Sequence, residues 1–427
     1  MGGNITINRR FLGPYFSVEW SIFPTVESVF PRLKNLVSMR DVKRNSNIIE
    51  TKLAFCDEDS SLPSTKNLHR QLTAIDLFAG AGGFSQAAKN VGIKILAAVE
   101  MNKKACETYE ANLVENSSPR IYNEDINKLD PIEIKNNHFP DELECDILLG
   151  GPPCQGFSVH RINNSGVDDP RNQLVLRYFQ YVKHLKPKIF LMENVPGILW
   201  ARHRPFLDAL YEEGQKSGYR LLDPVVIDAR DFGVPQRRKR VFVLGIREDT
   251  ELSIVWPAIP THGNEDARSE NPQLLPWLSA ATIFSDPIPV GDVNNIHMNH
   301  TPEIIRAFQQ TPLNGGSRRQ SGRVLPCHTE HNGHSDVYGR IDPSQPGPTM
   351  TTACINPSKG RFVHPTEHHG ITLRQAARFQ TFPDSFVFKG GLMAGGAQVG
   401  NAVPVRLGQV LLKTIADGII AGENSNG

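Results

Sequence analysis

The sequence predicts an α/β protein with a doubly wound, mostly parallel sheet and a second, smaller, loop-rich domain. From about residue 71 to residue 255, short apolar segments alternate with segments of helical character, an order typical of parallel β-α-β units. A glycine-rich turn follows the first apolar segment. After about Trp256, Pro, Gly, Asn, Ser and His dominate up to about His369, which predicts irregular structure with short strands.

The length and period of the apolar segments place the individual elements. We expect strands at residues 73–79, 94–100, 145–151, 188–195 and 238–246, and a third unit of the pattern that ends near Asp125. We expect helices at residues 84–90, 103–113, 372–380 and 405–421. Residues 1–70 lack clear periodicity, so we predict no fold for them.

Length and composition limit the class of protein. A chain of 427 residues suggests two or three domains. Its six cysteines are widely scattered, as in proteins of a reducing cytoplasm rather than in a disulfide framework. We see no run of about 18 apolar residues and no apolar signal-peptide region at the start. We therefore expect a cytoplasmic protein that does not contact a membrane.

The net charge gives an ambiguous indication of the partner. It is +1, from 46 basic and 45 acidic side chains, and taken alone it argues against nucleic acid. The charge is unevenly distributed, however, because residues 301–390 contain ten Lys and Arg against six Asp and Glu. The whole-chain value therefore does not exclude a local basic surface.

A glycine-rich turn at residues 76–85 has the composition of a ligand-binding loop. It follows a predicted strand and opens a predicted helix, so glycine lets the backbone approach a ligand and helix N–H groups point toward it. Glu100 ends the next strand, twenty residues after Gly80, where a carboxylate suits ribose hydroxyls. The spacing is not G-x-G-x-x-G, and a tight turn of an ordinary α/β protein is the alternative. Asp125 would extend the same crevice.

Two further strand ends carry reactive side chains. Cys154 follows Pro152 and Pro153 at the carboxyl end of a strand, and a rigidly presented thiol suits a nucleophile. The usual alternative for a cysteine is a small buried apolar residue. Glu193 ends the next strand and would face the same crevice, where a half-buried carboxyl group can act as an acid. A capping or turn residue is the alternative.

A basic segment precedes the last predicted strand of the first domain. Alternation along a strand places Gln236, Arg238 and Arg240 on one face, with Arg237 and Lys239 opposite. Such a cluster can orient an anion or a polar base, although a solvated basic patch is the alternative. Cysteines and histidines between residues 327 and 369 raise the possibility of structural zinc, but they form neither C-x-x-C nor H-E-x-x-H. We therefore expect no metal.

Together these segments resemble the DNA (cytosine-5) methyltransferase family. The resemblance runs from about residue 72 to the end of the chain, with the motifs in the family's order: 76–85, 150–158, 193–195, 236–240, 374–383 and 400–404. It implies a Rossmann-like, S-adenosylmethionine-dependent fold and a prokaryotic restriction–modification enzyme that methylates C5 of cytosine in a short sequence of duplex DNA. Residues 1–70 and the stretch between Arg247 and Arg374 depart from the family pattern.

The resemblance also implies roles for single residues. Cys154 would add to C6 of a flipped cytosine, Glu193 would act at N3, Arg238 would hold the base and Arg240 would support that cluster. S-adenosylmethionine, and S-adenosylhomocysteine as product, would contact Asp76, Phe78, Ala79, Gly80, Gly82, Gly83, Glu100, Met101, Asp125, Ile126, Pro152, Asn401 and Ala402. Asn401 would also brace the catalytic and cofactor sites. DNA would contact Gln155, Ser158, Arg318, Arg319, Arg323 and Thr351.

The resemblance divides the chain into functional parts. Residues 1–70 form an N-terminal extension of unknown role, 71–255 the catalytic and cofactor-binding domain, 256–390 the target-recognition domain, and 391–427 a segment that returns to the catalytic domain. The expected partners are double-stranded DNA and a cognate restriction endonuclease acting on the same site, with the enzyme itself a monomer. A transfer RNA cytosine-5 methyltransferase and a catalytically inactive DNA-binding relative are the alternatives.

Overall fold

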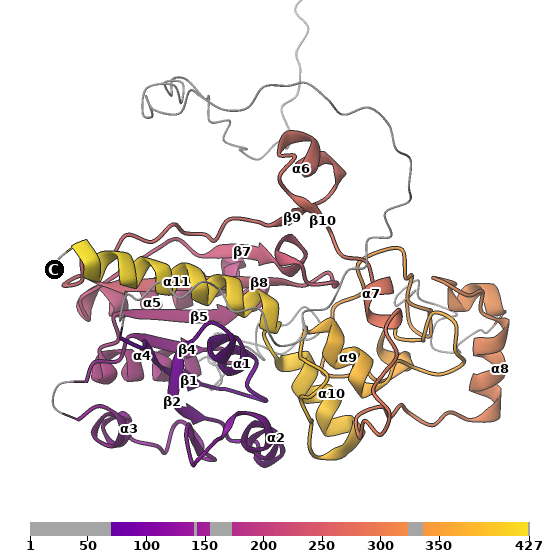
Figure 1. Cartoon of the computed structure of the whole chain (residues 1–427), viewed down its shortest axis with the longest axis horizontal. Helices are drawn as coiled ribbons and strands as arrows, with labels where there is room; N and C mark the ends of the chain where they lie inside the picture. Colours follow the sequence, from indigo (N-terminus) through magenta and orange to yellow (C-terminus); the bar gives the residue numbers. More distant parts are fainter. Residues whose placement is uncertain (1–69, 141–142, 154–172, 323–335, 426–427) are drawn as a thin grey trace, which may run out of the picture. The chain divides into compact units, whose positions relative to one another are not determined.

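The computed structural model describes residues 70–140, 143–153, 173–322 and 336–425, all of which belong to one compact unit of the chain. An eight-stranded sheet in the order β3-β2-β1-β4-β5-β8-β6, with β7 paired to β8, is its centre (Figure 1). The sheet strands are β1 (Thr73–Leu77), β2 (Lys94–Val99), β3 (Arg120–Tyr122), β4 (Ile147–Gly150), β5 (Ile189–Asn194), β6 (Tyr219–Leu221), β7 (Val225–Asp228) and β8 (Lys239–Arg247). A separate parallel pair comprises β9 (His262–Gly263) and β10 (Leu275–Pro276).

The sheet is mostly parallel, as predicted. Strands β1 to β5 pair in parallel, whereas β8 runs antiparallel to β5, β6 and β7. The strand order reverses at β1, which has β2 on one side and β4 on the other. Open α/β sheets bind their ligands in the crevice at such a point, beyond the carboxyl ends of the strands.

Helices cover both faces of the sheet because alternate strand residues point to opposite faces. Ala74 and Ile147 belong to one buried cluster, together with residues of α1 and α11. Ile75 and Leu148 belong to the other, together with residues of α3, α4 and α5. The helices are α1 (Gly83–Asn90), α2 (Lys103–Leu113), α3 (Pro131–His138), α4 (Gln173–Leu185), α5 (Arg204–Lys216), α6 (Glu265–Glu270), α7 (Ala281–Phe284), α8 (Pro302–Gln310), α9 (Leu373–Phe379), α10 (Gly391–Asn401) and α11 (Val405–Ser425).

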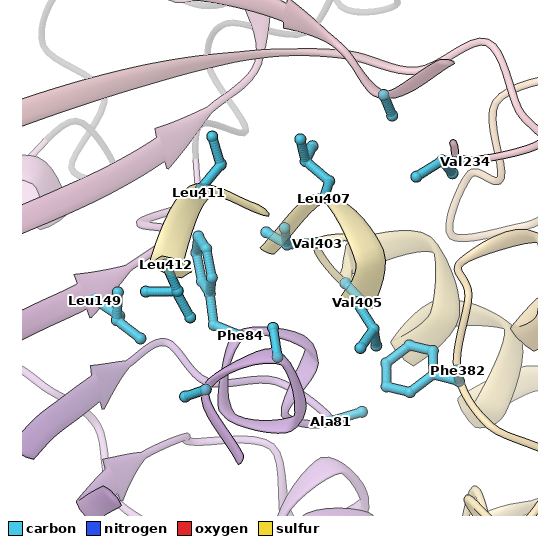
Figure 2. Close-up of a cluster of buried hydrophobic side chains, with 14 of the residues drawn as sticks. Ala81, Phe84, Leu149, Val234, Phe382, Val403, Val405, Leu407, Leu411 and Leu412 are labelled. Carbon is cyan, nitrogen blue, oxygen red and sulfur yellow. The ribbon is translucent and has the colours of Figure 1, made fainter. Parts of the chain in front are cut away.

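The first buried cluster extends from the sheet into the irregular part of the chain. It joins Phe84 of α1 and Leu149 of β4 to Met350, Phe362 and Phe382. Figure 2 shows the beginning of α11 in this cluster, with Leu412 beside Phe84 and Val405 toward Phe382. Because one core serves both regions, the last helix holds the irregular region against the sheet.

Most predicted elements are present with shifted ends. The first strand ends at Leu77 rather than at residue 79, because Phe78 adopts a left-handed conformation with φ of 57°. Helix α5 and the short strands β6 and β7, as well as α8 and α10, are present although the sequence pattern did not predict them. Among the described residues, no helix combines the length and the apolar composition needed to cross a bilayer.

An ion-pair network joins distant segments at the amino ends of the central strands. The carboxylate of Asp146, just before β4, is buried and accepts hydrogen bonds from Arg70 Nη1 at 2.7 Å and from the Thr73 backbone N–H at 2.9 Å. Lys188, just before β5, lies 3.5 Å from Asp146 and 2.7 Å from Glu423 of α11. The network thus ties two strand ends and the last helix to the start of β1.

We expect Asp146→Asn to lower the free energy of unfolding by about 1–3 kcal/mol at pH 7, because a buried ionised acceptor is lost. Burial opposes ionisation of Asp146, but hydrogen bonds from Arg70 and Thr73 outweigh it and lower its pKa. A lowered folded-state pKa stabilises the fold above the unfolded-state pKa of about 4, and this contribution is lost as pH falls through the folded value. Urea unfolding should therefore show the difference between variant and wild type shrinking below about pH 4.

Asp249→Asn is the matched control, since Asp249 also pairs with an arginine but is exposed. Its effect should stay below about 0.5 kcal/mol. Equal unfolding free energies for the two variants at pH 7 would show that the buried network does not stabilise the fold.

Candidate active site

The register of the central strands aligns the ends that carry the predicted site residues. Leu77, the last residue of β1, pairs with Val99 of β2 and with Gly150 of β4. Gly150 in turn pairs with Met192 of β5. The residues that follow these positions, among them Phe78, Glu100 and Glu193, therefore share the carboxyl edge of the sheet.

The glycines of the first turn serve different purposes. A side chain on Gly82 would lie 2.3 Å from Leu113, and one on Gly83 would lie 2.5 Å from the Val403 carbonyl oxygen, so both positions must remain small for packing. Gly80 has a positive φ of 58° and faces open space. Only Gly80 thus matches the expected close approach of backbone to ligand, while Phe78 and Ala79 form the bend before it.

Glu100 connects this turn to the end of β2. Its carboxylate accepts hydrogen bonds from the Gly80 N–H at 2.9 Å and from the Asn102 N–H at 2.7 Å. Burial raises its pKa, and these backbone hydrogen bonds act in the opposite direction. Met101, which follows, is 70% exposed. The predicted pair of a glycine turn and an acidic strand end is therefore in direct contact.

Asp76 and the Asp125–Ile126 pair lie around the same turn. Asp76 is buried beneath it and accepts a 2.6 Å hydrogen bond from the Ser85 hydroxyl, which in turn accepts one from Tyr109. Burial raises the pKa of Asp76 to about 7. Asp125 is partly exposed, whereas Ile126 is buried. Asp76 thus supports the loop from below.

Glu193 is paired with an arginine. Its Oε1 lies 2.7 Å from Arg240 Nε, and both side chains are mostly buried. Asn194 donates a 3.3 Å hydrogen bond to the Pro152 carbonyl oxygen, so the segment that leads to Cys154 begins beside Glu193. Cys154 itself, like Gln155, Ser158 and Arg323, lies outside the described residues.

Arg238, which we predicted to hold the base, is buried. It is 1% exposed, and its guanidinium donates 2.9 Å hydrogen bonds to the carbonyl oxygens of Met350, Gly400 and Ala402. Both terminal nitrogens of the Arg238 guanidinium therefore bind backbone carbonyl groups of the protein. Arg240, and not Arg238, forms the ion pair with Glu193.

The predicted alternation along this segment is nevertheless correct. Gln236 and Arg238 are buried and Arg240 is mostly buried, whereas Arg237 and Lys239 are exposed. Alternation indicates which residues share a face, but it does not indicate which of them reaches the site.

Sequence reasoning missed the amide pair that completes this network. Gln236 donates to Gln380 Oε1 at 2.6 Å and accepts from the Met350 N–H at 2.9 Å. Gln380 donates to the Ala402 carbonyl oxygen at 2.9 Å. The sequence signal for Gln380 was its place in residues 374–383, which have the pattern R-x-x-x-R-x-Q-x-F-P. Its partner Gln236 lies 144 residues away in the chain, so the sequence did not indicate the pair.

The C-terminal motif contributes backbone groups to this network. A side chain on Gly400 would lie 2.2 Å from the Thr351 carbonyl carbon, so the two segments pack backbone against backbone. Asn401 is exposed and Ala402 is buried. On either side of Asn401, the carbonyl groups of Gly400 and Ala402 accept hydrogen bonds from Arg238 and Gln380.

Part of the basic excess in residues 301–390 does not face solvent. Arg318, which we predicted to contact DNA, is 5% exposed. Arg340 donates to the backbone carbonyls of Thr311 and Phe308, and Arg374 forms a buried ion pair with Asp292. Arg319 and Thr351 are exposed, as DNA contacts must be. Counting charges in the sequence therefore overestimates the basic surface.

The cysteines and histidines of this region do not gather around a metal within the described residues. Cys354 is buried against the Gly396 carbonyl oxygen. His297 and His369 stack on each other with ring centroids 3.9 Å apart. Four other candidates for zinc ligands lie outside the described residues: Cys327, His328, His331 and His334.

Comparison with known proteins identifies relatives over most of the chain. A family model for C-5 cytosine-specific DNA methylases matches residues 72–417. The type II methyltransferase M.DdeI of Desulfomicrobium norvegicum is 30% identical over 383 residues, covering 81% of this chain and 88% of its own. The type II methyltransferase M.NgoFVII of Neisseria gonorrhoeae is 31% identical over 362 residues, covering 84% and 90%.

Solved structures share the fold. A prophage-encoded Escherichia coli chain assigned as a DNA modification methyltransferase has a TM-score of 0.63 at 24% identity, covering 82% of this chain and 100% of that chain. A DNMT2 mutant from Spodoptera frugiperda has a TM-score of 0.54 at 18% identity, covering 81% and 100%. At such identities these likenesses establish the architecture alone.

We expect Arg238→Met to lower the free energy of unfolding by about 3 kcal/mol, because a chain of similar length cannot donate to the three buried carbonyl groups. Arg237→Met is the adjacent control, since Arg237 is exposed, and it should change stability by less than about 0.5 kcal/mol. Urea unfolding of both variants at pH 7 measures the difference. If Arg238→Met proves as stable as its neighbour, the carbonyl groups must find other donors and the network is not required.

Proposed function

The chain belongs to the C-5 cytosine-specific DNA methylase family and is a sequence-specific DNA (cytosine-5) methyltransferase of the type II restriction–modification kind, and on this premise we propose a role in the reaction for each residue of the site. The observation that carries the proposal is the Glu193–Arg240 pair, which stands beside the start of the segment bearing Cys154. Together with the thiol that follows Pro153 in the sequence, a carboxyl group and a cation are the groups that nucleophilic attack on a cytosine ring needs.

The cofactor part of the site fits a nucleoside with a charged tail. The family and the fold use S-adenosylmethionine in general, and that molecule supplies the methyl group. Glu100 offers carboxylate oxygens to ribose hydroxyls, and Gly80 offers an open backbone position. Exposed Met101 and partly exposed Asp125 border the same edge. Asp76 and Gly82 act beneath the surface, by supporting and packing the loop.

In the proposed reaction the thiolate of Cys154 adds to C6 of the target cytosine, which turns the ring into an enamine at C5. Glu193 protonates or hydrogen-bonds N3 and so stabilises the adduct. C5 then accepts the methyl group. Transfer of the C5 proton to water, return of any N3 proton to Glu193 and expulsion of the Cys154 thiolate then restore the aromatic ring. Because C6 is unreachable inside a stacked duplex, the cytosine must first leave the helix.

The two arginines take separate roles in this scheme. Arg240 touches Glu193 and orients its carboxyl group toward the base. Arg238 is a positioning residue, because it and Gln236 attach the start of β8 to residues 350 and 400–402. The strand that carries Arg240 is thereby held at a fixed distance from the exposed Thr351 segment.

For the DNA side we propose that residues 256–390 recognise the target sequence. Exposed Arg319 and Thr351 are the described candidates for direct contact, together with Gln155, Ser158 and Arg323. The type II designation of the relatives supports a cognate endonuclease that acts on the same sequence. It also favours DNA over transfer RNA as substrate. We propose that the enzyme acts as a monomer.

Expression in a host that lacks cytosine methylation should mark cytosine within one short sequence, seen by bisulfite conversion. Cys154→Ala should abolish this mark while the purified protein still binds S-adenosylmethionine, because the thiol acts only on the base. Absence of 5-methylcytosine from wild-type DNA, with purified protein also inert, would refute the proposed activity. Turnover by Cys154→Ala would refute the nucleophile alone.

We expect Arg240→Met to lower kcat about 100-fold with both KM values within about threefold of wild type, because the carboxyl group loses its orientation but neither substrate loses a contact. Arg240→Lys should recover at least about tenfold of that loss, since it restores a cation beside Glu193. Arg220→Met on β6, an exposed arginine, is the control. A rise in KM for S-adenosylmethionine with unchanged kcat would contradict the orienting role.

A further inference from the structure

An exposed aromatic segment follows the carboxylate of the site along the chain. After β5 the chain passes through two 3-10 turns, η3 (Pro196–Leu199) and η4 (Ala201–His203), before α5 leads it away. Residues 199–202, which we call the tryptophan loop, are consecutively exposed. Leu199 and Trp200 are each 36% exposed, so an apolar surface faces solvent here without a covering element among the described residues.

Buried residues hold the tryptophan loop at both ends. Ile198 before it and His203 after it are buried. The Trp200 N–H donates to the Gly197 carbonyl oxygen at 3.1 Å, and the His203 N–H donates to the Trp200 carbonyl oxygen at 2.8 Å. The backbone that carries the indole is therefore organised before any partner arrives, which lowers the entropy cost of binding.

A cation lies against the indole ring. The Arg202 guanidinium carbon is 4.7 Å from the centroid of the Trp200 ring, and Arg202 Nε donates to His203 Nε2 at 2.9 Å. The His203 ring lies at 25° to the indole with centroids 6.5 Å apart. An aromatic face joined to a guanidinium is the combination that proteins use to stack on nucleotides and to bind the adjoining phosphates.

The position of the loop matches the path of the substrate. Trp200 lies seven residues after Glu193, at the carboxyl end of β5, and η3 contacts β8, the strand that carries Arg240. A cytosine delivered to the Glu193–Arg240 pair brings its flanking nucleotides to this edge of the sheet. The positive charge of Arg202 complements the phosphates of those nucleotides.

We propose that the tryptophan loop binds the DNA strand next to the flipped cytosine, with Trp200 stacking on a flanking nucleotide and Arg202 donating to a phosphate. The contact is independent of sequence, because every nucleotide offers a ring face and a phosphate. This inference rests on the proposed site. It gives the enzyme a DNA contact outside the family motifs and outside the recognition region.

The test is equilibrium binding of a short fluorescein-labelled duplex that carries the sequence identified by bisulfite conversion, with S-adenosylhomocysteine present. Trp200→Ala should raise the Kd about tenfold, as for loss of one stacked base. Trp200→Phe should stay within about threefold, because it keeps an aromatic face. Arg202→Ala should lower the slope of log Kd against log salt by about 1, the value for one phosphate contact.

Intrinsic fluorescence reports the contact directly. The chain has three other tryptophans, Trp20, Trp256 and Trp277, so the difference between wild type and Trp200→Phe isolates the signal of Trp200. DNA should quench wild type more strongly than Trp200→Phe. Equal quenching in the two proteins would place Trp200 away from DNA and overturn the proposal.

Matched controls separate a local contact from general damage. Ile132→Ala removes an exposed apolar side chain from α3, and Lys216→Ala removes an exposed charge from the far end of α5. Both should leave the Kd and the salt dependence unchanged. The affinity for S-adenosylmethionine and the midpoint of thermal unfolding should stay at wild-type values in every variant.

Two results would overturn the inference. If Trp200→Ala binds DNA like wild type at an unchanged unfolding midpoint, the loop serves another partner, such as a protein. If kcat falls while the Kd for DNA is unchanged, the loop acts through a contact within the chain. Wild-type methylation of the same duplex is measured in parallel, so failure of the proposed activity is distinguished from failure of this contact.

Discussion

A single buried guanidinium connects the parts of this enzyme. Arg238 enters the interior from the start of β8 and ends on carbonyl groups of residues 350, 400 and 402. Burying a cation costs less when its donors find acceptors, and Nη1 and Nη2 of Arg238 find theirs only where these segments come together. Gln236 and Gln380 complete the same arrangement through amide hydrogen bonds. Strand β8, the Thr351 segment and the C-terminal motif are therefore one structural unit.

This constraint has a direct consequence for the chemistry. Arg240 follows Arg238 by two residues and is paired with Glu193 on the neighbouring strand. Because Arg238 is immobilised, the strand presents Arg240 to Glu193 in a defined register. The proposed cofactor side is organised separately, through the contact of Glu100 with Gly80 and through Asp76 beneath the loop. The Glu193–Arg240 pair and the Glu100–Gly80 contact lie along the same edge of the sheet, where the neighbouring strands β1, β4 and β5 end.

The number of basic residues in the sequence does not give the number that are exposed at the surface. The basic excess of residues 301–390 suggested an electropositive recognition face, yet Arg318, Arg340 and Arg374 are buried. Arg340 and Arg374 organise loops that lack regular secondary structure, by donating to backbone carbonyl groups and to Asp292. Positive surface for DNA then depends on fewer exposed residues. Arg319 and, in the tryptophan loop, Arg202 are examples.

The sequence by itself determined the α/β class, the positions of most strands, and the identity of Glu100 and Glu193 as strand-end carboxylates. These features depend on local periodicity and on the rule that strands present functional groups at their carboxyl ends. It also determined which face Gln236 and Arg238 occupy. Only the tertiary structure decided that Arg240 rather than Arg238 meets Glu193, that Gly82 serves packing, and that Trp200 is exposed. Those outcomes depend on partners that are distant along the chain or on burial, and neither is encoded in local sequence pattern.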